Sequence, residues 1–164
     1  MIHRQHFANL CIALVVAGFA IGGCSSADDG RTITVEHGPV PAPVLLDLGD
    51  EGPSVGDQRI FHLEGTWDGK TVLTDWLMTT TALDTPEAGV ETRVTNAVIM
   101  LDGLDSTLLL EGTGWYPSES SILKTADTLV RAVIGGTGEF AGAAGWVEST
   151  KRADNSWTHV FHLE

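Results

Sequence analysis

The sequence predicts an all-β fold, arranged as a sandwich or a barrel. Seven or eight segments rich in Thr, Val, Leu and Trp follow residue 55, at the spacing of short antiparallel strands. Gly, Asp and Pro separate these segments, and convincing helical periodicity is hard to find. We therefore expect one domain of consecutive strands joined by tight turns.

Each expected strand is bounded by residues that favour turns. Asp68-Gly69 is a strong hairpin signal between the first two strands. A loop at 84–89 and the pair Asp102-Gly103 bound the third strand. Segment 122–127 could hold a further short strand or one helical turn. The expected strands are 58–67, 70–82, 90–101, 107–112, 129–134, 144–150 and 157–163.

The N-terminus has the layout of a secretory signal. Arg4 precedes an apolar run at 7–21, which is about 15 residues long and therefore too short for a comfortable membrane span. Gly22-Gly23-Cys24 then resembles a bacterial lipobox, which implies cleavage before Cys24 and lipidation of its sulfur. The alternative is an ordinary secretory signal followed by an incidental thiol. We expect an extracytoplasmic protein, anchored by lipid to the membrane of a bacterial envelope.

Three regions follow from this organisation: a signal at 1–23, a lipid-anchored tether at 24–54 and a β-barrel domain at 55–164. Four of the six prolines lie in the tether, where they favour an extended, semi-stiff backbone. Val44-Leu45-Leu46 interrupts the tether and could dock on the domain or form a first edge strand.

Charge and cysteine content exclude several classes of protein. The net charge of −13 argues against binding to nucleic acid or to an anionic lipid surface. Cys11 lies in the signal, and a lipidated Cys24 has no free thiol. The secreted domain then has no disulfide, no thiolate metal site and no thiol nucleophile, so core packing alone must stabilise it.

A glycine-rich segment at 135–146 follows an apolar strand. A phosphate-binding loop is excluded there, because no Lys-Ser or Lys-Thr pair and no helical pattern follow. The segment resembles the signature of the allene oxide cyclase and dirigent barrel superfamily, in which Gly-Gly-Thr-Gly is followed by an aromatic residue and small residues. The matching positions are Gly135, Gly136, Thr137, Gly138, Phe140, Gly142 and Gly145.

This resemblance covers about residues 55–164, including Gly56-Asp57 and the final Phe161-His162-Leu163. It implies a closed, antiparallel eight-stranded β-barrel of calycin-like appearance, often trimeric, with a largely apolar interior. Relatives control the conformation of a reactive small molecule in that interior, and they use neither a metal nor an organic cofactor. One departure is Ala144, where relatives commonly carry Arg.

Four charged residues in expected strands are candidates for acid–base catalysis, because a carboxylate inside a barrel has a raised pKa and can exchange a proton. The alternative places each of them on the solvated outer wall. These candidates are Asp75, Glu111, Arg131 and Glu148.

Aromatic residues are candidates for binding an apolar guest, and they could equally form the core. The candidates are Trp76, Trp115, Tyr116 and Trp157. We expect no metal site, since His159 and His162 point to opposite faces of one strand. His62 and His162 would be neighbours if the end strands pair, but two histidines make a poor metal site.

Two functions fit the sequence. The first is a surface-anchored barrel that binds a small hydrophobic molecule and guides its cyclisation or coupling, as a cofactor-independent cyclase or isomerase would. The second is a non-catalytic envelope lipoprotein that binds lipid or a protein partner. The family resemblance implies that the chain forms a homotrimer. The missing Arg at Ala144 and the lipid anchor favour binding over catalysis.

Overall fold

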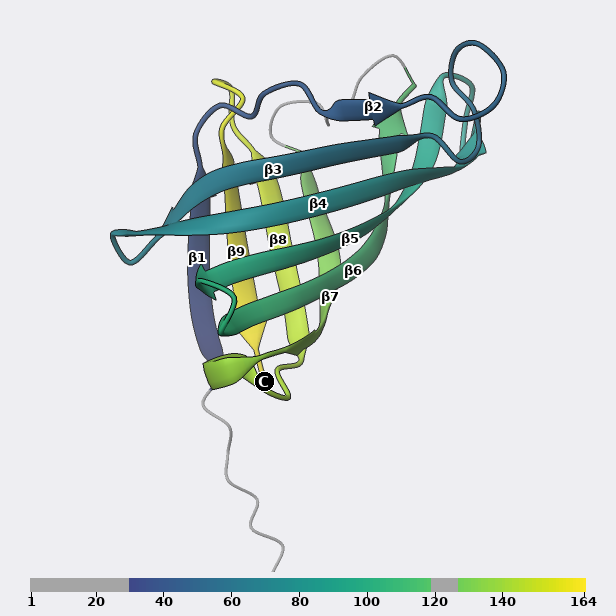
Figure 1. Cartoon of the computed structure of the whole chain (residues 1–164). Helices are drawn as coiled ribbons and strands as arrows, with labels where there is room; N and C mark the ends of the chain where they lie inside the picture. The colour runs from purple at the N-terminus through teal and green to yellow at the C-terminus, as the bar shows by residue number, and fades with distance from the viewer. Residues whose placement is uncertain (1–29, 119–126) are drawn as a thin grey trace, which may run out of the picture.

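Nine antiparallel strands form one continuous sheet in the computed structural model, which describes residues 30–118 and 127–164 (Figure 1). Eight strands close into a barrel and one lies outside it, so the predicted all-β, eight-stranded antiparallel barrel is confirmed. The strands are β1 (Arg31–His37), β2 (Val44–Leu46), β3 (Gln58–Trp67), β4 (Lys70–Leu83), β5 (Val90–Asp102), β6 (Ser106–Pro117), β7 (Thr128–Gly136), β8 (Gly145–Lys151) and β9 (Trp157–Leu163).

The barrel closes between β1 and β3. Strand β1 pairs along its whole length with β9, and its last two residues also pair with Thr66 and Gly65 of β3. Strand β2 continues the sheet beyond β3 as a short edge strand over the upper end of the barrel in Figure 1. Of the two options open for Val44–Leu46, the structure therefore shows the edge strand.

The barrel begins earlier than the expected boundary at residue 55. Strand β1 lies in the segment that we expected to be a tether, 24–54, and it separates β9 from β3. Ile33, Val35 and His37 alternate inward along it, which is the period of a half-buried strand. His62 and His162 are consequently not neighbours, because an additional strand stands between theirs.

The expected hairpin at Asp68-Gly69 is confirmed. Both residues have positive φ, 48° and 72°, as a type I′ turn between β3 and β4 requires. The expected strands recur as β3 to β9 with small differences at their ends. The largest difference is in β6, which continues five residues past the expected end at Gly112.

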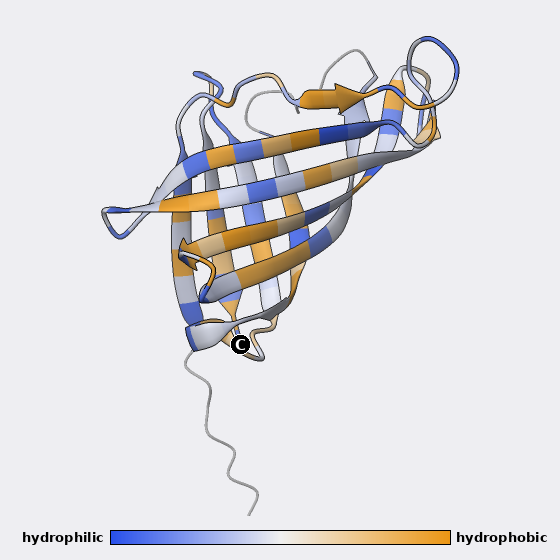
Figure 2. Cartoon of the chain, viewed as in Figure 1, coloured by the Kyte–Doolittle hydropathy of each residue, from blue (hydrophilic) through white to orange (hydrophobic). Residues whose placement is uncertain are grey.

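Hydrophobic and hydrophilic residues alternate along the barrel strands (Figure 2). The lower half of the interior is a continuous apolar core, which also receives Phe140 from the one-turn 3-10 helix η1 (Gly138–Phe140). This end carries the start of β1 and the C-terminal end of β9. The core there includes Ile33, Ile99, Leu101, Leu108, Val133, Val147, Phe161 and Leu163.

The glycine-rich segment turns the chain at this lower end, from β7 through η1 into β8. Gly138 and Gly145 have φ values of 58° and 134°, and a Cβ on either would collide with a backbone carbonyl of a neighbouring strand or turn. Side chains are therefore excluded at both positions. Gly135 and Gly136 end strand β7, and Thr137 and Gly142 lie in the turn itself.

Several expectations concern residues outside the described ranges. These are the signal at 1–23, the lipidation of Cys24, and most of segment 122–127. Within the described ranges, no helix has the length and apolar character needed to cross a membrane.

Candidate functional site

The inward-facing side chains differ in type between the lower half of the barrel and its upper end, where β2 lies. Polar and aromatic side chains replace the aliphatic ones of the lower half, and they are just as deeply buried. The set that surrounds the barrel axis there comprises Trp76, Tyr116, Arg131, Ser149, Trp157 and His159, contributed by β4, β6, β7, β8 and β9.

Arg131 is the centre of this set. Its side chain is 4% exposed, and its Nη2 donates to the Tyr116 hydroxyl at 2.7 Å. Its Nη1 donates to Ser149 Oγ at 3.3 Å, and its guanidinium lies 5.7 Å from the Trp76 ring centroid. The buried Nε–H has no hydrogen-bond partner among the described residues. Burying a guanidinium costs free energy unless its charge is compensated, so this arrangement is typical of a site rather than of a core.

His159 lies beside Arg131 and is held neutral. Burial lowers its pKa well below the usual value, and the charges of His37 and Arg131 lower it further. Its Nδ1 hydrogen-bonds Ser149 Oγ at 2.9 Å. Its ring lies 4.9 Å from that of Trp76 and stacks parallel to that of Trp157 at 6.1 Å. The site therefore contains a neutral imidazole, able to exchange one proton, between two indoles.

Trp76 is oriented by a chain of hydrogen bonds that crosses from β4 to β1. Its indole N–H donates to Thr74 Oγ1 at 2.9 Å, and that hydroxyl lies 3.5 Å from His37 Nε2. His37 Nδ1 in turn lies 3.1 Å from the Glu64 carbonyl, which can only accept. Burial lowers the pKa of His37, although the hydrogen bond to Glu64 opposes this. The indole ring is thus fixed before any guest arrives.

Glycines in β6 make room for Arg131. The inward positions of this strand change from Leu108 and Leu110 to Gly112 and Gly114. A Cβ on Gly112 would lie 2.8 Å from Arg131 Cγ, so the Arg131 side chain occupies the space that a larger residue would fill. At Gly112 and Gly114 strand β6 therefore has no side chain that would compete with Arg131 for space.

A second buried polar group stabilises the same end of the barrel. Glu91 Oε2 accepts from Arg93 Nε at 3.0 Å and from Thr80 Oγ1 at 2.9 Å, and Arg59 Nη2 lies 3.4 Å away. The Arg93 guanidinium covers the Tyr116 ring at 4.6 Å. Burial lowers the pKa of Arg93, opposed by its hydrogen bond to Glu91. Through Tyr116 this cluster fixes the hydroxyl to which Arg131 donates.

A cavity of about 40 Å³ opens among these side chains. Its lining is mostly apolar, and Arg131 and His159 supply the polar groups. The volume is enough for about three waters, so a larger guest must displace side chains at the mouth. Met78 is a flexible, half-buried lining residue, and Val40 belongs to the loop after β1. The other lining residues are Phe61, Leu63, Trp76 and Trp157.

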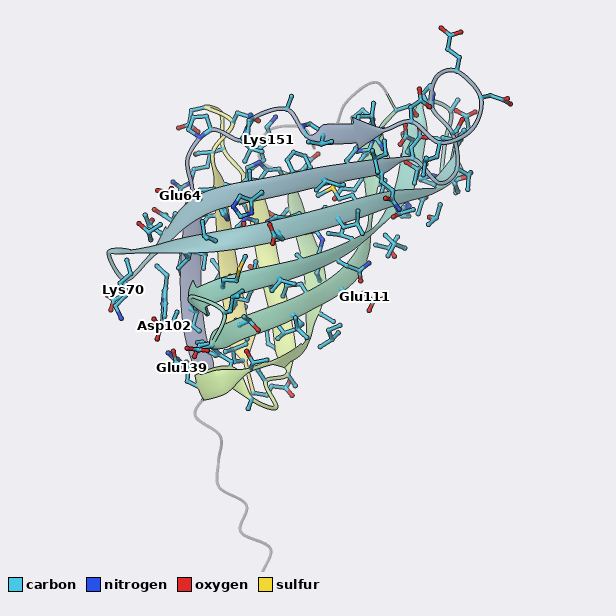
Figure 3. The ribbon with its side chains drawn as sticks, viewed as in Figure 1. Glu64, Lys70, Asp102, Glu111, Glu139 and Lys151 are labelled. Atoms are coloured by element: carbon cyan, nitrogen blue, oxygen red, sulfur yellow. The ribbon has the colours of Figure 1, made fainter. Side chains whose placement is uncertain are left out.

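Of the four charged candidates, only Arg131 lies inside the barrel. Asp75, Glu111 and Glu148 occupy outward positions, because strand alternation places Trp76, Leu110 and Val147 inward beside them. Asp75 is paired with His62 at 2.5 Å on the surface, and Glu148 lies 3.9 Å from His162. Glu111 is exposed (Figure 3). No interior contact supports a proton-transfer role for these carboxylates.

Three of the four aromatic candidates line the interior: Trp76, Tyr116 and Trp157. Trp115 is 60% exposed on the outer wall. Trp115 and Tyr116 lie beyond the expected strand end at Gly112, whereas β6 continues through both of them and strand alternation places them on opposite faces.

Ser149, His159 and the Glu91 cluster were not among the sequence candidates. One signal for them was available: Ser149 and His159 alternate inward with Val147 and Phe161, so an inward polar pair follows once the register of β8 and β9 is known. In the described part of the chain, no three His, Cys, Asp or Glu side chains gather as metal ligands would.

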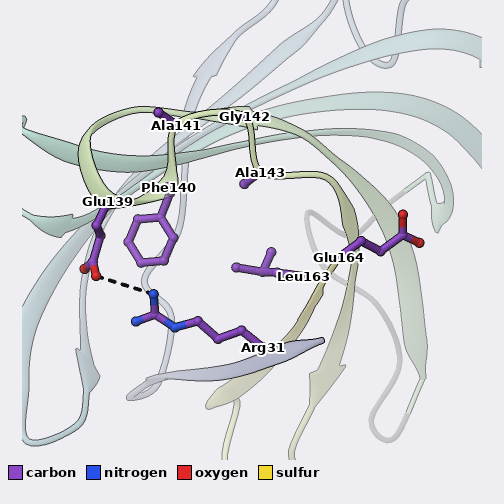
Figure 4. A pocket seen from close by; sticks show the side chains of 8 residues that line it. All are labelled: Arg31, Glu139, Phe140, Ala141, Gly142, Ala143, Leu163 and Glu164. Atoms are coloured by element: carbon purple, nitrogen blue, oxygen red, sulfur yellow. Dashed lines mark hydrogen bonds and ion pairs between the residues drawn. The ribbon is translucent and has the colours of Figure 1, made fainter. Parts of the chain in front are cut away.

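A second, shallower pocket lies at the lower end of the barrel (Figure 4). Arg31 reaches from the start of β1 across the Phe140 ring, 4.9 Å from its centroid, and pairs with Glu139 at 3.4 Å. Both partners are about half exposed, so this ion pair contributes little to stability. The pocket is an open polar depression without a buried charge.

No protein-family model and no curated protein sequence matches this chain. Among solved structures, the chain is similar to one described as a pyocyanin demethylase. The two share 24% identity with a TM-score of 0.62, over 82% of this chain and 100% of the other. The likeness shows the fold, an eight-stranded barrel.

Proposed function

We propose that the upper half of this barrel binds a small hydrophobic molecule. The observation that carries the proposal is the cavity beside Trp76 and Trp157. Its lining is mostly apolar, and Arg131 and His159 are its polar lining residues. Few polar groups on an apolar wall are typical of small-molecule sites. The solved structure similar to this chain is named for a reaction on a small molecule, which agrees with a guest inside the barrel.

Native mass spectrometry of the purified protein tests this proposal. We expect a fraction of the protein to carry an organic molecule that is released on denaturation. Substituting Trp157 by Ala removes one wall of the cavity and should reduce the bound fraction. Trp115→Ala, on the outer wall, is the matched control and should leave it unchanged. Equal retention by both variants would place the molecule elsewhere.

A second candidate function is proton-transfer catalysis, in line with the resemblance to allene oxide cyclases and dirigent proteins. Its support is the neutral His159, hydrogen-bonded to Ser149, beside the Arg131 and Tyr116 donors. In such a reaction His159 takes a proton from a carbon acid of the guest and returns it at another position. Arg131 stabilises the negative charge that develops on the guest's oxygen meanwhile. Deuterium exchange into a bound ketone, lost in His159→Gln, would support this function.

We further propose that the barrel is tethered to an envelope membrane through Cys24. Only six residues lie between Cys24 and Arg31, so the lower end of the barrel would stand within about 25 Å of the lipid. The cavity is at the opposite end and would open toward the aqueous phase. Mass spectrometry of the membrane-extracted protein tests the acyl group, which Cys24→Ser would abolish.

The alternative of a non-catalytic lipoprotein with a protein partner is supported by the outer wall. An apolar hollow of about 400 Å³ crosses β3 to β7. Its lining includes the exposed Ile60 and Ile134 and the half-buried Leu77, Val98 and Leu109. We propose that a second copy of this chain covers it, as in the homotrimer implied by family resemblance. Sedimentation analysis of Ile134→Glu against the unchanged protein tests the assembly.

A further inference from the structure

The Arg131 charge has no counter-charge in the described part of the chain. Its two Nη groups donate to neutral hydroxyls, those of Tyr116 and Ser149, and no described carboxylate lies within 4 Å of the guanidinium. His159 of β9 interacts with Arg131, and His37 of β1 lies against the His159 ring. Burial lowers the pKa of both imidazoles, which favours their uncharged forms.

Glu91 does not compensate Arg131 either. Its Oε2 is occupied by Arg93, Arg59 and Thr80, and its Oε1 has no hydrogen-bond partner among the described residues. The Arg93 guanidinium covers the Tyr116 ring, whose hydroxyl accepts from Arg131, so Glu91 connects to Arg131 only through Tyr116. Within the described ranges Asp57 is the other buried carboxylate, and its two oxygens accept from the backbone amides of Leu48 and Ser54. The barrel interior therefore has an excess of positive charge at Arg131, inside a strongly acidic protein.

Two further observations connect this charge with the cavity. Arg131 is itself a lining residue, and its buried Nε–H has no hydrogen-bond partner within residues 30–118 and 127–164. The Trp76 and Trp157 rings supply flat apolar walls next to it. An isolated buried cation is costly, whereas one that meets an anion in a low-dielectric site forms short, strong hydrogen bonds.

We propose that the guest is a flat organic anion, whose carboxylate, phenolate or enolate oxygen binds the guanidinium of Arg131 while its unsaturated body lies against the indoles. This inference rests on the proposed function and narrows it from hydrophobic molecules in general to hydrophobic anions. The acidic surface repels polyanions and also repels the guest at long range. Among the described residues Arg131 is the one arginine or lysine that lines the cavity, so selectivity for an anion comes from its guanidinium. Raising the ionic strength should speed association, because salt screens that repulsion.

Isothermal titration calorimetry with two matched probes tests the inference: 2-naphthoate and 2-naphthamide, which share one ring system and differ in charge. We expect naphthoate to bind at least tenfold more tightly than naphthamide. Arg131→Gln should abolish this preference, and Arg131→Lys should retain part of it. The ratio of the two affinities is the readout, because a purely structural role of Arg131 would change both affinities together.

Arg152→Gln is the control variant, since Arg152 is half exposed and pairs with Glu36 on the surface; its preference should equal that of the unchanged protein. Thermal unfolding verifies that each variant is folded. Equal affinity for the two probes would overturn the anion inference and leave the proposed function standing. Binding of neither probe would overturn both.

Discussion

The two halves of this barrel are built from the same strands and differ in what those strands turn inward. In the lower half β6 presents Leu108 and Leu110, and β9 presents Phe161 and Leu163. In the upper half β6 presents Gly112, Gly114 and Tyr116, and β9 presents Trp157 and His159. The lower half is filled, whereas the upper half retains a cavity beside a buried charge. Strand alternation therefore fixes which positions face inward, and residue type decides whether they form a core or a site.

The comparison predicts that the lower half dominates stability. Phe161 is fully buried in the core, and Phe161→Ala should reduce the free energy of unfolding by about 3–5 kcal/mol, because it leaves a cavity that neighbours fill only partly. Urea denaturation followed by tryptophan fluorescence measures this. If the same substitution cost less than one at Trp157, the division of the barrel into core and site would be wrong.

Gly112→Ala should damage the site more than the fold. The added Cβ would lie 2.8 Å from Arg131 Cγ, so the guanidinium must move or the strands must separate. We expect a loss of about 1–3 kcal/mol in stability from this overpacking and at least a tenfold loss in affinity for an anionic probe. Gly135→Ala is the matched control, since its Cβ would meet only Leu109 Cδ1 at an ordinary 3.8 Å. Equal affinity in the two variants would contradict the role given to Gly112.

Acid should destabilise the upper half specifically. Burial lowers the pKa of His159 and His37, while both titrate near 6.5 in the unfolded chain. Between the folded and unfolded pKa values the unfolded state binds more protons, so the free energy of unfolding falls as the pH drops below about 6.5. The slope is at most about 1.4 kcal/mol per pH unit for each histidine. Denaturation curves measured from pH 8 to pH 5 give the free energy of unfolding at each pH. In His159→Gln this free energy should fall less steeply with decreasing pH, and an unchanged pH dependence would contradict a neutral His159 in the folded protein.

The smallest effect is expected on the outer surface. Arg152 Nη2 pairs with Glu36 at 2.7 Å, and both side chains are about half exposed. Glu36→Gln should change the free energy of unfolding by less than about 1 kcal/mol, because solvent and salt screen such pairs. A larger loss, measured by the same denaturation assay, would show that β1 is fixed to the barrel by this pair more than by its paired strands.

Sequence reasoning predicted the fold better than the site. The Asp68-Gly69 hairpin and the strands around it followed from local rules, because turn chemistry and alternation are local properties. Strand β1 is not predicted, because the prolines after it favour an extended tether over the whole segment. Ile33 and Val35 nevertheless alternate with Thr residues, which is a strand pattern. Its partner strands, β9 and β3, lie far away in the chain and leave no local signal.

The site depends on register, which the sequence does not state. Arg131, Ser149 and His159 meet only because β7, β8 and β9 pair with particular offsets. Without those offsets, the outward carboxylates of Asp75, Glu111 and Glu148 looked equivalent to an inward Arg131. Gly112 likewise marks the expected end of a strand, whereas in the structure its missing side chain leaves the space that the Arg131 side chain occupies.

The most direct test of the account is the set of indole N–H signals in a ¹⁵N-labelled sample titrated with 2-naphthoate, because the tryptophans report separately on the interior and the outer wall. We predict saturable shifts of the Trp76 and Trp157 signals and unchanged signals for Trp115 and Trp146, which are exposed. Shifts confined to Trp115 and Trp146, or no shift at any indole, would contradict a binding site in the upper half of the barrel.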